Sequence, residues 1–253
     1  KMNRQPSVIP VMAHLVLGYP TLAESLNTAE KYVAAGVQIL ELQIPFSHPT
    51  ADGSVITLAC QEATRQGVSV KQCIEAIKSL RAQFPTQEII VMSYLNRLYT
   101  YGFQAFVTEM EFAGVQYLIV PDLPADVAQT FVPPPSSLKI VPVLAANTSD
   151  ARLEKLQTGG FDFFYLMSDF KITGSGFSLH PSLKALIKKI KSWPVGTSQH
   201  PPRVGIGFGI STPEQAKLVA AEADIAIIGS TLIQAQNMGN LEAYLGSLRQ
   251  VFN

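Results

Sequence analysis

The chain has 253 residues, which at about 150 residues per domain allows two small domains or one large α/β or all-β unit. Apolar residues make up 47% and charged residues only 15%, so an extensive core is possible and intrinsic disorder is excluded. Nineteen Lys and Arg balance nineteen Asp and Glu, and a neutral chain lacks the basic excess that nucleic-acid or membrane-surface binding needs. So few charges indicate that a partner covers part of the surface.

The two cysteines, Cys60 and Cys73, stand in no metal-ligand spacing. We therefore expect no disulfide scaffold and no metal site, and a reducing, cytoplasmic setting. The apolar stretch 8–17 follows two basic residues, as in a signal peptide, but Pro10 and His14 interrupt it and no small-x-small cleavage site follows. No window approaches the roughly 18 to 20 uninterrupted apolar residues that span a bilayer.

Apolar runs of strand length alternate with stretches of helical period along the whole chain. Strands are predicted at 14–18, 37–44, 89–94, 116–120, 139–144, 161–167, 203–208 and 224–229. Helices are predicted near 21–35, 69–83, 103–113, 124–131, 149–158, 181–192, 212–221 and 240–252. The order is a repeated βα unit.

Glycines mark the ends of several predicted helices in the same way. Gly36 and Gly114 each stand between an Ala and a Val-Gln pair, and Gly159-Gly160 precedes Phe161, so the unit recurs. Eight such units match a closed (β/α)8 barrel better than an open doubly wound sheet, and no Gly-x-Gly-x-x-Gly opens the first helix. We expect a single TIM-barrel domain over residues 1–253, with mobile loops near 45–58 and 168–180.

The second predicted strand carries a carboxylate among apolar residues. Because side chains alternate, Leu40, Leu42 and Ile44 share one face, which the surrounding helices would cover, and Glu41 projects into the barrel. Burial raises the pKa of such a group toward the range useful for proton transfer. An interior ion pair or a hydrogen-bonded structural role is the alternative.

The loop after this strand, 45–53, is rich in Pro and small polar residues. It can hold Asp52 over the barrel mouth as a second carboxylate, and two carboxylates with different burial can divide acid and base roles. Asp52 could equally cap the next segment or form a turn with Gly53.

Glycines follow the last two predicted strands. Gly205, Gly207 and Gly209 lie in and after the seventh, and Gly229-Ser230 follows the eighth. Backbone N–H groups in such loops, with helix N-termini, bind phosphate in this fold. His14 could be a catalytic base, although a lone His on an apolar strand is more often a core residue, and Asn96 and Asp122 could line a rim for substrate or partner.

These residues together resemble the tryptophan synthase alpha chain family. The resemblance rests on Leu17-Gly18-Tyr19-Pro20, on the block from Glu41 to Gly53, on Tyr94-Leu95-Asn96, on Val120 to Pro124, on Thr173-Gly174 and on Gly207 to Gln215. It covers essentially the whole chain in order, and the block from Glu41 to Gly53 is specific to the family.

The resemblance implies a lyase that splits indole-3-glycerol phosphate into indole and glyceraldehyde 3-phosphate. It also implies a partner, the beta chain, which carries pyridoxal phosphate in an alpha2beta2 heterotetramer; no cofactor is expected in this chain. Glu41 matches the family's acid/base residue, and Asp52 the carboxylate that accepts the indole N–H. Substrate-binding residues by the same match are Tyr165, Thr173, Gly174, Phe208, Gly209, Gly229 and Ser230. Residues that face the beta chain are Pro45, His48, Pro49, Asn96 and Pro124.

The chain also departs from the family pattern. Gln43 stands in place of Gly on the face of Glu41, about 6.6 Å further toward the mouth at ~3.3 Å per residue, where it would occupy substrate space or hydrogen-bond the Glu41 carboxylate. His48 replaces Asp on the partner-facing loop. Asp169 replaces Arg beside a route for phosphate, and Lys171 replaces Gly in the closing loop.

Three hypotheses follow. The first is a working lyase, supported by the matched site residues. The second is a catalytically weak alpha subunit that mainly binds and activates the beta chain, supported by the departures at 43, 48 and 169–171. The third, a generic phosphate-binding barrel isomerase, does not explain the block from Glu41 to Gly53. We favour the family function, with activity open to impairment by the departures.

Overall fold

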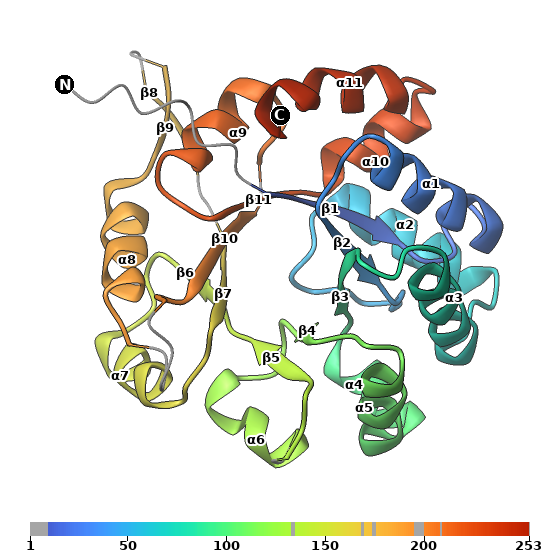
Figure 1. Ribbon diagram of the computed structural model, residues 1–253, viewed down its shortest axis with the longest axis horizontal. Helices are drawn as coiled ribbons and strands as arrows, with labels where there is room; N and C mark the ends of the chain where they lie inside the picture. The colour runs from blue at the N-terminus through green and yellow to red at the C-terminus, as the bar shows by residue number, and fades with distance from the viewer. Residues whose placement is uncertain are drawn as a thin grey trace.

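The fold was obtained as a computed structural model, which describes residues 10–132, 135–167, 170–173, 176–194, 200–207 and 209–252. A parallel nine-stranded sheet in the order β5-β4-β3-β2-β1-β11-β10-β7-β6 curves into a barrel inside a ring of helices (Figure 1). Its strands are β1 Val11–Val16, β2 Ile39–Gln43, β3 Glu88–Met92, β4 Tyr117–Ile119, β5 Lys139–Val141, β6 Val143–Ala145, β7 Phe163–Met167, β10 Arg203–Gly207 and β11 Ile225–Ile228. The predicted (β/α)8 barrel is confirmed.

The barrel closes through β5 and β6, which form the two ends of the sheet order yet are separated only by Pro142. Proline has no N–H to donate, so it interrupts the ladder for one residue. Its carbonyl still accepts a hydrogen bond of 2.9 Å from the Tyr165 N–H. The stretch 139–145 therefore pairs with β4 at one end and β7 at the other, whereas the sequence predicted one uninterrupted strand.

Most helices lie where the sequence predicts them. They are α1 Leu22–Ala34, α3 Val70–Gln83, α5 Phe103–Phe112, α7 Asp150–Thr158, α8 Pro181–Lys191, α9 Pro213–Ala220 and α11 Leu241–Phe252. The predicted helix 124–131 is instead a 3₁₀ turn, η1 Ala125–Val127, followed by the single turn α6 Ala128–Phe131. Side chains fix several starts: Thr21 caps α1, and capping boxes of Ser69 with Gln72 and Thr212 with Gln215 begin α3 and α9.

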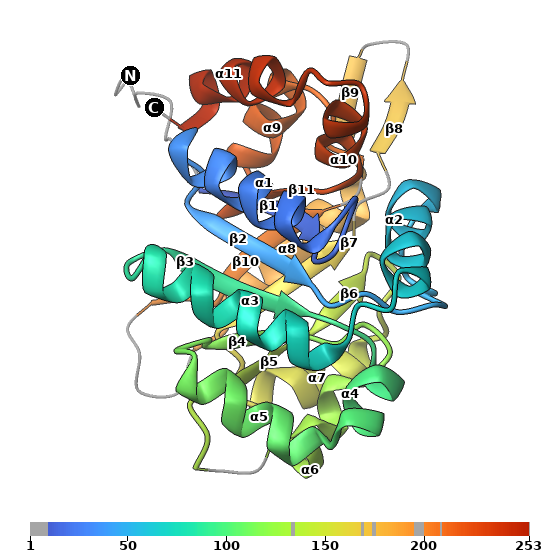
Figure 2. The same ribbon diagram turned by 90° about the vertical axis from the view of Figure 1, so that its right-hand side faces the viewer.

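Three helices and a hairpin were not predicted. The helices are α2 Ser54–Arg65, α4 Leu95–Tyr101 and α10 Ser230–Asn237, each starting within about ten residues of a strand end. The strands β8 Phe170–Thr173 and β9 Gly176–Leu179 pair antiparallel in the segment expected to be a loop. Figures 1 and 2 show this hairpin at the edge of the molecule, where β9 contacts α9.

The core has two layers that follow the alternation of the strands. Leu40, Leu42 and Ile44 belong to the cluster between sheet and helices, as predicted. Ile39 and Met92 belong to a second cluster inside the barrel. Glu41 and Gln43 share this inner face, so the polar groups of β2 are surrounded by apolar side chains.

The barrel is filled at the end where its strands begin. Arg203 makes a bidentate pair with Glu88 at 3.1 and 2.7 Å, and its guanidinium lies 5.1 and 5.0 Å from the ring centroids of Tyr117 and Phe163. These four are the first residues of β10, β3, β4 and β7. Access to the interior is therefore from the carboxyl ends of the strands.

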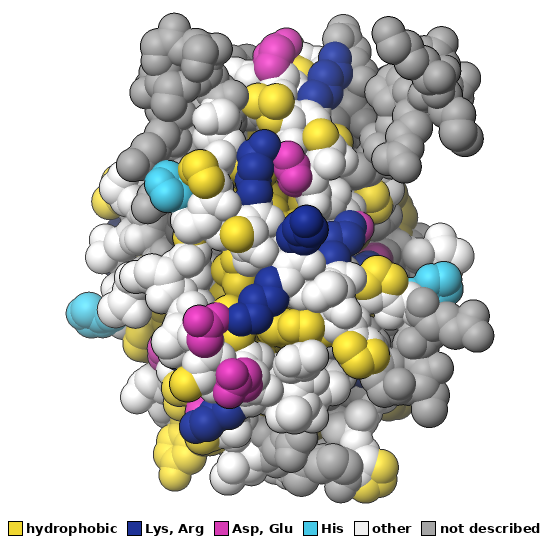
Figure 3. Space-filling model, turned by 90° about the vertical axis from the view of Figure 1, so that its left-hand side faces the viewer, with side chains coloured by type: hydrophobic (Ala, Val, Ile, Leu, Met, Phe, Trp, Pro, Cys, Tyr) yellow, Lys and Arg dark blue, Asp and Glu magenta, His cyan; other side chains and the backbone are white. Residues whose placement is uncertain are grey.

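Charges of both signs are interspersed on the face that carries α8 (Figure 3). Lys184 pairs with Glu222 at 2.8 Å, Lys189 with Asp150 at 2.6 Å and Lys191 with Asp224 at 2.5 Å. A nearby carboxylate thus offsets the charge of each of these three lysines, so they do not form a patch of one sign. Among the helices in the described ranges, none is long and apolar enough to cross a membrane.

Candidate active site

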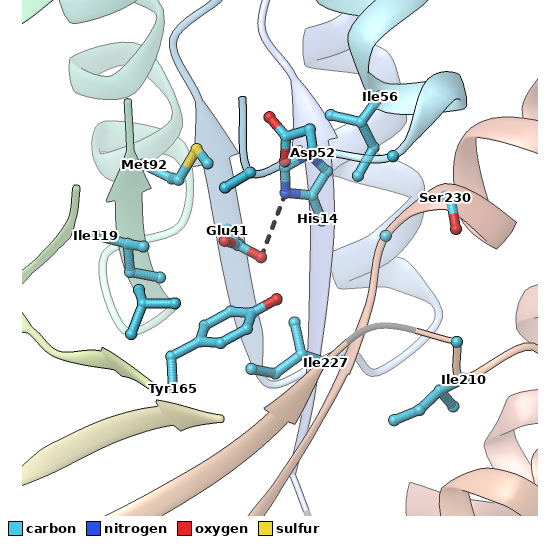
Figure 4. A pocket seen from close by; sticks show the side chains of 15 residues that line it. His14, Glu41, Asp52, Ile56, Met92, Ile119, Tyr165, Ile210, Ile227 and Ser230 are labelled. Carbon is cyan, nitrogen blue, oxygen red and sulfur yellow. Dashed lines mark ion pairs between the residues drawn. The ribbon is translucent and has the colours of Figure 1, made fainter. Parts of the chain in front are cut away.

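A cavity opens at the carboxyl ends of the strands and collects residues from around the barrel (Figure 4). Its polar lining comes from β1, β2, the loop after β2, β7 and the start of α10: His14, Glu41, Asp52, Tyr165 and Ser230. Its apolar lining includes Ile56, Met92, Ile119, Val143, Ile210 and Ile227. A few convergent polar groups on an apolar wall are typical of a small-molecule site.

Glu41 projects into this cavity and is paired there. Because β1 and β2 run in register with His14 opposite Glu41, the His14 Nδ1 atom lies 3.3 Å from Glu41 Oε2, and both side chains are only 4% exposed. Burial by itself lowers the pKa of His14, but the charge and hydrogen bond of Glu41 outweigh it, so the pKa of this imidazole is raised. His14 is therefore part of the site and not an inert core residue, and the ion pair left open by the sequence is present.

Asp52 is held over the same cavity by two donors. Gln43 donates from Nε2 to Asp52 Oδ2 at 2.7 Å, and the Tyr94 hydroxyl donates to the same oxygen at 2.9 Å. Burial raises the pKa of Asp52, while the charge of His14 and the two hydrogen bonds oppose that rise. The residue before α2, Gly53, has no side-chain cap, so the Asp52 carboxylate serves the cavity and not the helix.

Gln43 lies differently from the sequence expectation. Its amide bonds Asp52 and not Glu41, and the side chain is fully buried rather than among those lining the cavity. The path of the loop after β2 accounts for this, because it brings Asp52 back over the end of the strand on which Gln43 lies.

Tyr165 reaches the cavity from β7, and its ring points toward Glu41 in Figure 4. A β-carbon added at Gly207 would lie 2.2 Å from the Tyr165 hydroxyl oxygen, so the absence of a side chain there permits this ring position. Burial raises the pKa of Tyr165 well above its ordinary value, and the nearby Glu41 and Asp52 carboxylates act in the same direction. The phenol is neutral and can donate a hydrogen bond.

The loops after β10 and β11 form the wall of the cavity that faces Glu41. Gly209, Gly229 and Ser230 line it, and Gly209 has a positive φ of 83° that favours glycine. α10 begins at Ser230 with no side-chain cap, and the Thr231 hydroxyl donates to the Ile210 carbonyl at 3.2 Å, which joins the two loops. An uncapped helix N-terminus facing a cavity favours an anion.

Some predicted site residues fall outside what the structure describes. Gly174, Phe208 and Asp169 lie outside the described residues, and for Thr173 and Lys171 only the backbone in β8 is described.

The five residues predicted to face a partner lie around the same end of the barrel, on the loops after β2 and β4 and in α4, which follows β3. His48, Asn96 and Pro124 are exposed, whereas Pro45 and Pro49 are buried within the chain. The loops are tied together, since Asp122 accepts a 2.8 Å hydrogen bond from the Leu95 N–H and Phe46 stacks on Tyr94 with ring centroids 5.5 Å apart. Leu58 of α2 and Tyr99 of α4 add exposed apolar surface.

Tyr94 is a site residue to which sequence reasoning gave no role, and Gly207 was expected only to contribute to a phosphate-binding loop. Tyr94 follows β3 at the carboxyl end of the barrel, a position that alone marks it as a candidate. Gly207 carries no comparable signal, because its importance depends on the Tyr165 ring across the strand pair. Within the described ranges, no group of three or more His, Cys, Asp or Glu is placed to hold a metal ion.

The parallel barrel, its buried carboxylates and an uncapped helix at one rim define an enzyme of the TIM-barrel class. A family model described as "Tryptophan synthase alpha chain" matches residues 2–247. The chain belongs to the tryptophan synthase alpha chain family, whose members are lyases of tryptophan biosynthesis.

Similar proteins agree in sequence and in fold. The tryptophan synthase alpha chains of Syntrophotalea carbinolica and Dehalococcoides mccartyi are each 33% identical, over 95% of this chain and 94% and 93% of theirs. A solved structure of Mycobacterium tuberculosis tryptophan synthase superposes with a TM-score of 0.84 at 28% identity, covering 98% of this chain and 93% of that one.

Proposed function

We propose that this chain is an alpha subunit that cleaves indole-3-glycerol phosphate into indole and glyceraldehyde 3-phosphate, with Glu41 and Asp52 as its catalytic residues. The observation that carries the proposal is the placement of both carboxylates on one cavity whose far wall is the start of α10. A substrate with an indole at one end and a phosphate at the other matches this cavity, with the indole at the carboxylates and the phosphate at the start of α10.

Glu41 moves the protons of the retro-aldol step. The bond between indole C3 and the glycerol carbon breaks, C3 gains a proton, and the hydroxyl on the departing carbon loses one as it becomes the aldehyde. A buried, ionised carboxylate can take the proton of the hydroxyl and give a proton to C3, which restores its own charge. The His14 imidazole at 3.3 Å holds it at the cavity wall.

Asp52 accepts the indole N–H. Protonation at C3 places positive charge on the indole ring, and an ionised carboxylate at its N–H stabilises that charge. Both donors to Asp52 bind the same atom, Oδ2, which leaves Oδ1 for the substrate.

The phosphate binds between Gly209 and the first turn of α10, with Ser230 as a further donor. Glycines allow the backbone to approach the phosphate, and the helix dipole favours its charge. Thr173, Gly174 and Phe208 complete the substrate site in this proposal, which for them rests on the family match alone.

The partner is a beta chain that carries pyridoxal phosphate, in an alpha2beta2 assembly, and this chain needs no cofactor of its own. The exposed His48, Asn96 and Pro124 at the mouth of the barrel support a contact there. Pro45 and Pro49 stay in this proposal on the family match alone, because both are buried within the chain. A cytoplasmic setting completes the proposal.

Replacement of Glu41 by Gln tests the lyase function. Glutamine keeps the volume and an oxygen that can face His14, but it cannot transfer protons, so we expect turnover to fall by about 10²- to 10⁴-fold. Indole release from indole-3-glycerol phosphate is measured with and without the beta chain. Activation of the beta chain should persist; undiminished cleavage would remove Glu41 from the mechanism.

The alternative, a subunit that mainly activates the beta chain, is tested on the unaltered protein. The alternative predicts activation of the beta chain without appreciable indole release. Geometry supports the lyase, because the departure at Gln43 contributes a donor to Asp52 and does not line the cavity.

A further inference from the structure

Two polar side chains of the barrel interior are only half satisfied. His14 Nε2 and Gln43 Oε1 are buried atoms without a hydrogen-bond partner, although the opposite end of each group is engaged, His14 Nδ1 with Glu41 and Gln43 Nε2 with Asp52. A buried polar atom without a partner destabilises a protein by about 1–3 kcal/mol. Two such atoms on adjacent strands point to a shared function.

The strand register places these two groups close together. His14 lies opposite Glu41 and Val16 opposite Gln43, so His14 and Gln43 are diagonal neighbours on the inner face. The Gln43 side chain also contributes to raising the pKa of His14.

We propose that His14 and Gln43 are positioning residues that bridge the two carboxylates of the site, in the order Glu41, His14, Gln43, Asp52. The proposal rests on the proposed function for its catalytic consequence, but the bridge itself can be observed in the free protein.

The donors and acceptors of these four side chains determine the protonation state of His14 in the bridge. Because the Gln43 amide donates to Asp52, its oxygen is left to accept. A neutral imidazole with its proton on Nδ1 offers only a lone pair at Nε2, whereas the cation offers N–H groups at both nitrogens. The cation therefore serves Glu41 on one side and Gln43 on the other, in agreement with the raised pKa of His14.

A cation between two carboxylates couples their protonation. Burial raises the pKa of Asp52 and the charge of His14 opposes that rise, so loss of the His14 charge would raise the pKa of Asp52 further. The titratable groups that act on the His14 ring are Glu41 of β2 and Asp52 of the loop after it. Those that face the two carboxylates in turn are Cys60 of α2, Tyr94 before α4 and Tyr165 of β7.

The first test is ¹⁵N NMR of the imidazole in the free protein. We expect His14 to carry protons on both nitrogens near neutral pH and to lose one only above the ordinary histidine range. Gln43→Leu should lower this titration point and shift the Nε2 resonance. Tyr94→Phe is the matched control: it removes a donor from the same Asp52 oxygen but leaves the bridge, so both nitrogens of His14 should stay protonated near neutral pH. A neutral His14 that does not respond to Gln43→Leu overturns the bridge.

The second test is the pH profile of cleavage. His14→Gln keeps a donor for Glu41 but removes the charge, so the acid limb of kcat/KM should move to higher pH and kcat should fall about 10- to 100-fold, with KM little changed. His14→Phe should lower kcat at least as much. Wild-type kcat and pH profile in folded His14→Gln overturn the positioning role. If the unaltered protein does not cleave indole-3-glycerol phosphate, the proposed function is wrong. The NMR experiment still tests whether His14 and Gln43 form the bridge.

Discussion

At the scale of single residues, the structure gives Gln43 a different role from the one that the sequence predicted. Its replacement of a glycine suggested an obstruction or a bond to Glu41. The structure has it fully buried with its amide nitrogen 2.7 Å from Asp52 Oδ2. It therefore belongs to the support of the second carboxylate.

Gln43→Gly separates these two interpretations. An obstruction predicts that turnover rises. The observed contact predicts that kcat/KM near neutral pH falls roughly tenfold, since a hydrogen bond to a charged group contributes about 1.5–3 kcal/mol. Steady-state rates of indole release measure the change. An increase in kcat would support the interpretation of Gln43 as an obstruction.

Asp52 should also set the acid limit of the reaction. Burial raises its pKa above the usual aspartate value, and the protonated form cannot stabilise a cationic indole as a carboxylate does. Activity should therefore fall on the acid side at a higher pH than an ordinary aspartate would give. Tyr94→Phe removes one of the bonds that oppose the rise, so it should move this limb to still higher pH in a kcat/KM profile. A limb that stays in place or moves down would contradict this assignment.

Glu41 and Asp52 were predictable because their signals are local. Alternation along one strand places Glu41 inside the barrel, and the composition of one loop places Asp52 over the mouth. The sequence left His14 open between a catalytic base and a core residue and gave Tyr94 no role. Both roles depend on which residue of a neighbouring strand or loop stands opposite. That information resides in register and loop path, which one sequence does not reveal.

At the scale of elements, the contact between β7 and β10 depends on Gly207. A methyl group there would approach the Tyr165 hydroxyl to 2.2 Å. Gly207→Ala should therefore displace the ring, lower the free energy of unfolding by about 1–3 kcal/mol and reduce turnover.

Gly246→Ala in α11 is the control for this change. Nothing lies within 4 Å of a β-carbon at that position, and alanine favours a helix by up to about 1 kcal/mol. Urea unfolding of both variants should give opposite signs. Equal stability of Gly207→Ala and the unaltered protein would show that the ring relaxes without loss.

The strands were easier to predict than some helices, for a physical reason. Buried parallel strands are continuous apolar runs and stand out in any sequence. α2 and α10 follow their strands or loops so closely that the glycines and polar residues before them resemble turns. The predicted strand 139–144 is divided at Pro142 because proline has no N–H to donate to the sheet. The chain stays extended through this residue.

At the scale of the whole molecule, apolar side chains are exposed at the mouth of the barrel. Leu58 is 65% and Tyr99 69% exposed, on helices α2 and α4, which lie on the same side of the molecule in Figure 2. This agrees with the low charge of the chain and with the proposed partner.

Tyr99→Ala should weaken association with the beta chain by about tenfold or more, since an exposed Tyr is a frequent interface hot spot. Cleavage by the isolated chain should stay unchanged. Phe112→Ala is the matched control: Phe112 is 84% exposed but ends α5 close to the start of β4, at the opposite end of the barrel. Titration of beta-chain activation gives both affinities, and equal weakening by the two variants would argue against a contact at the mouth.

The pairing of β1 with β11 has a consequence for biosynthesis. Val11 and Ala226 are neighbours in the sheet but lie far apart in the sequence. While a ribosome is still making the chain, β1 has β2 on one side and an open hydrogen-bonding edge on the other, and such edges recruit strands from other chains. The nascent protein is thus vulnerable to aggregation until β11, more than 200 residues after β1, has been synthesised. Chaperone dependence should be greatest in that interval.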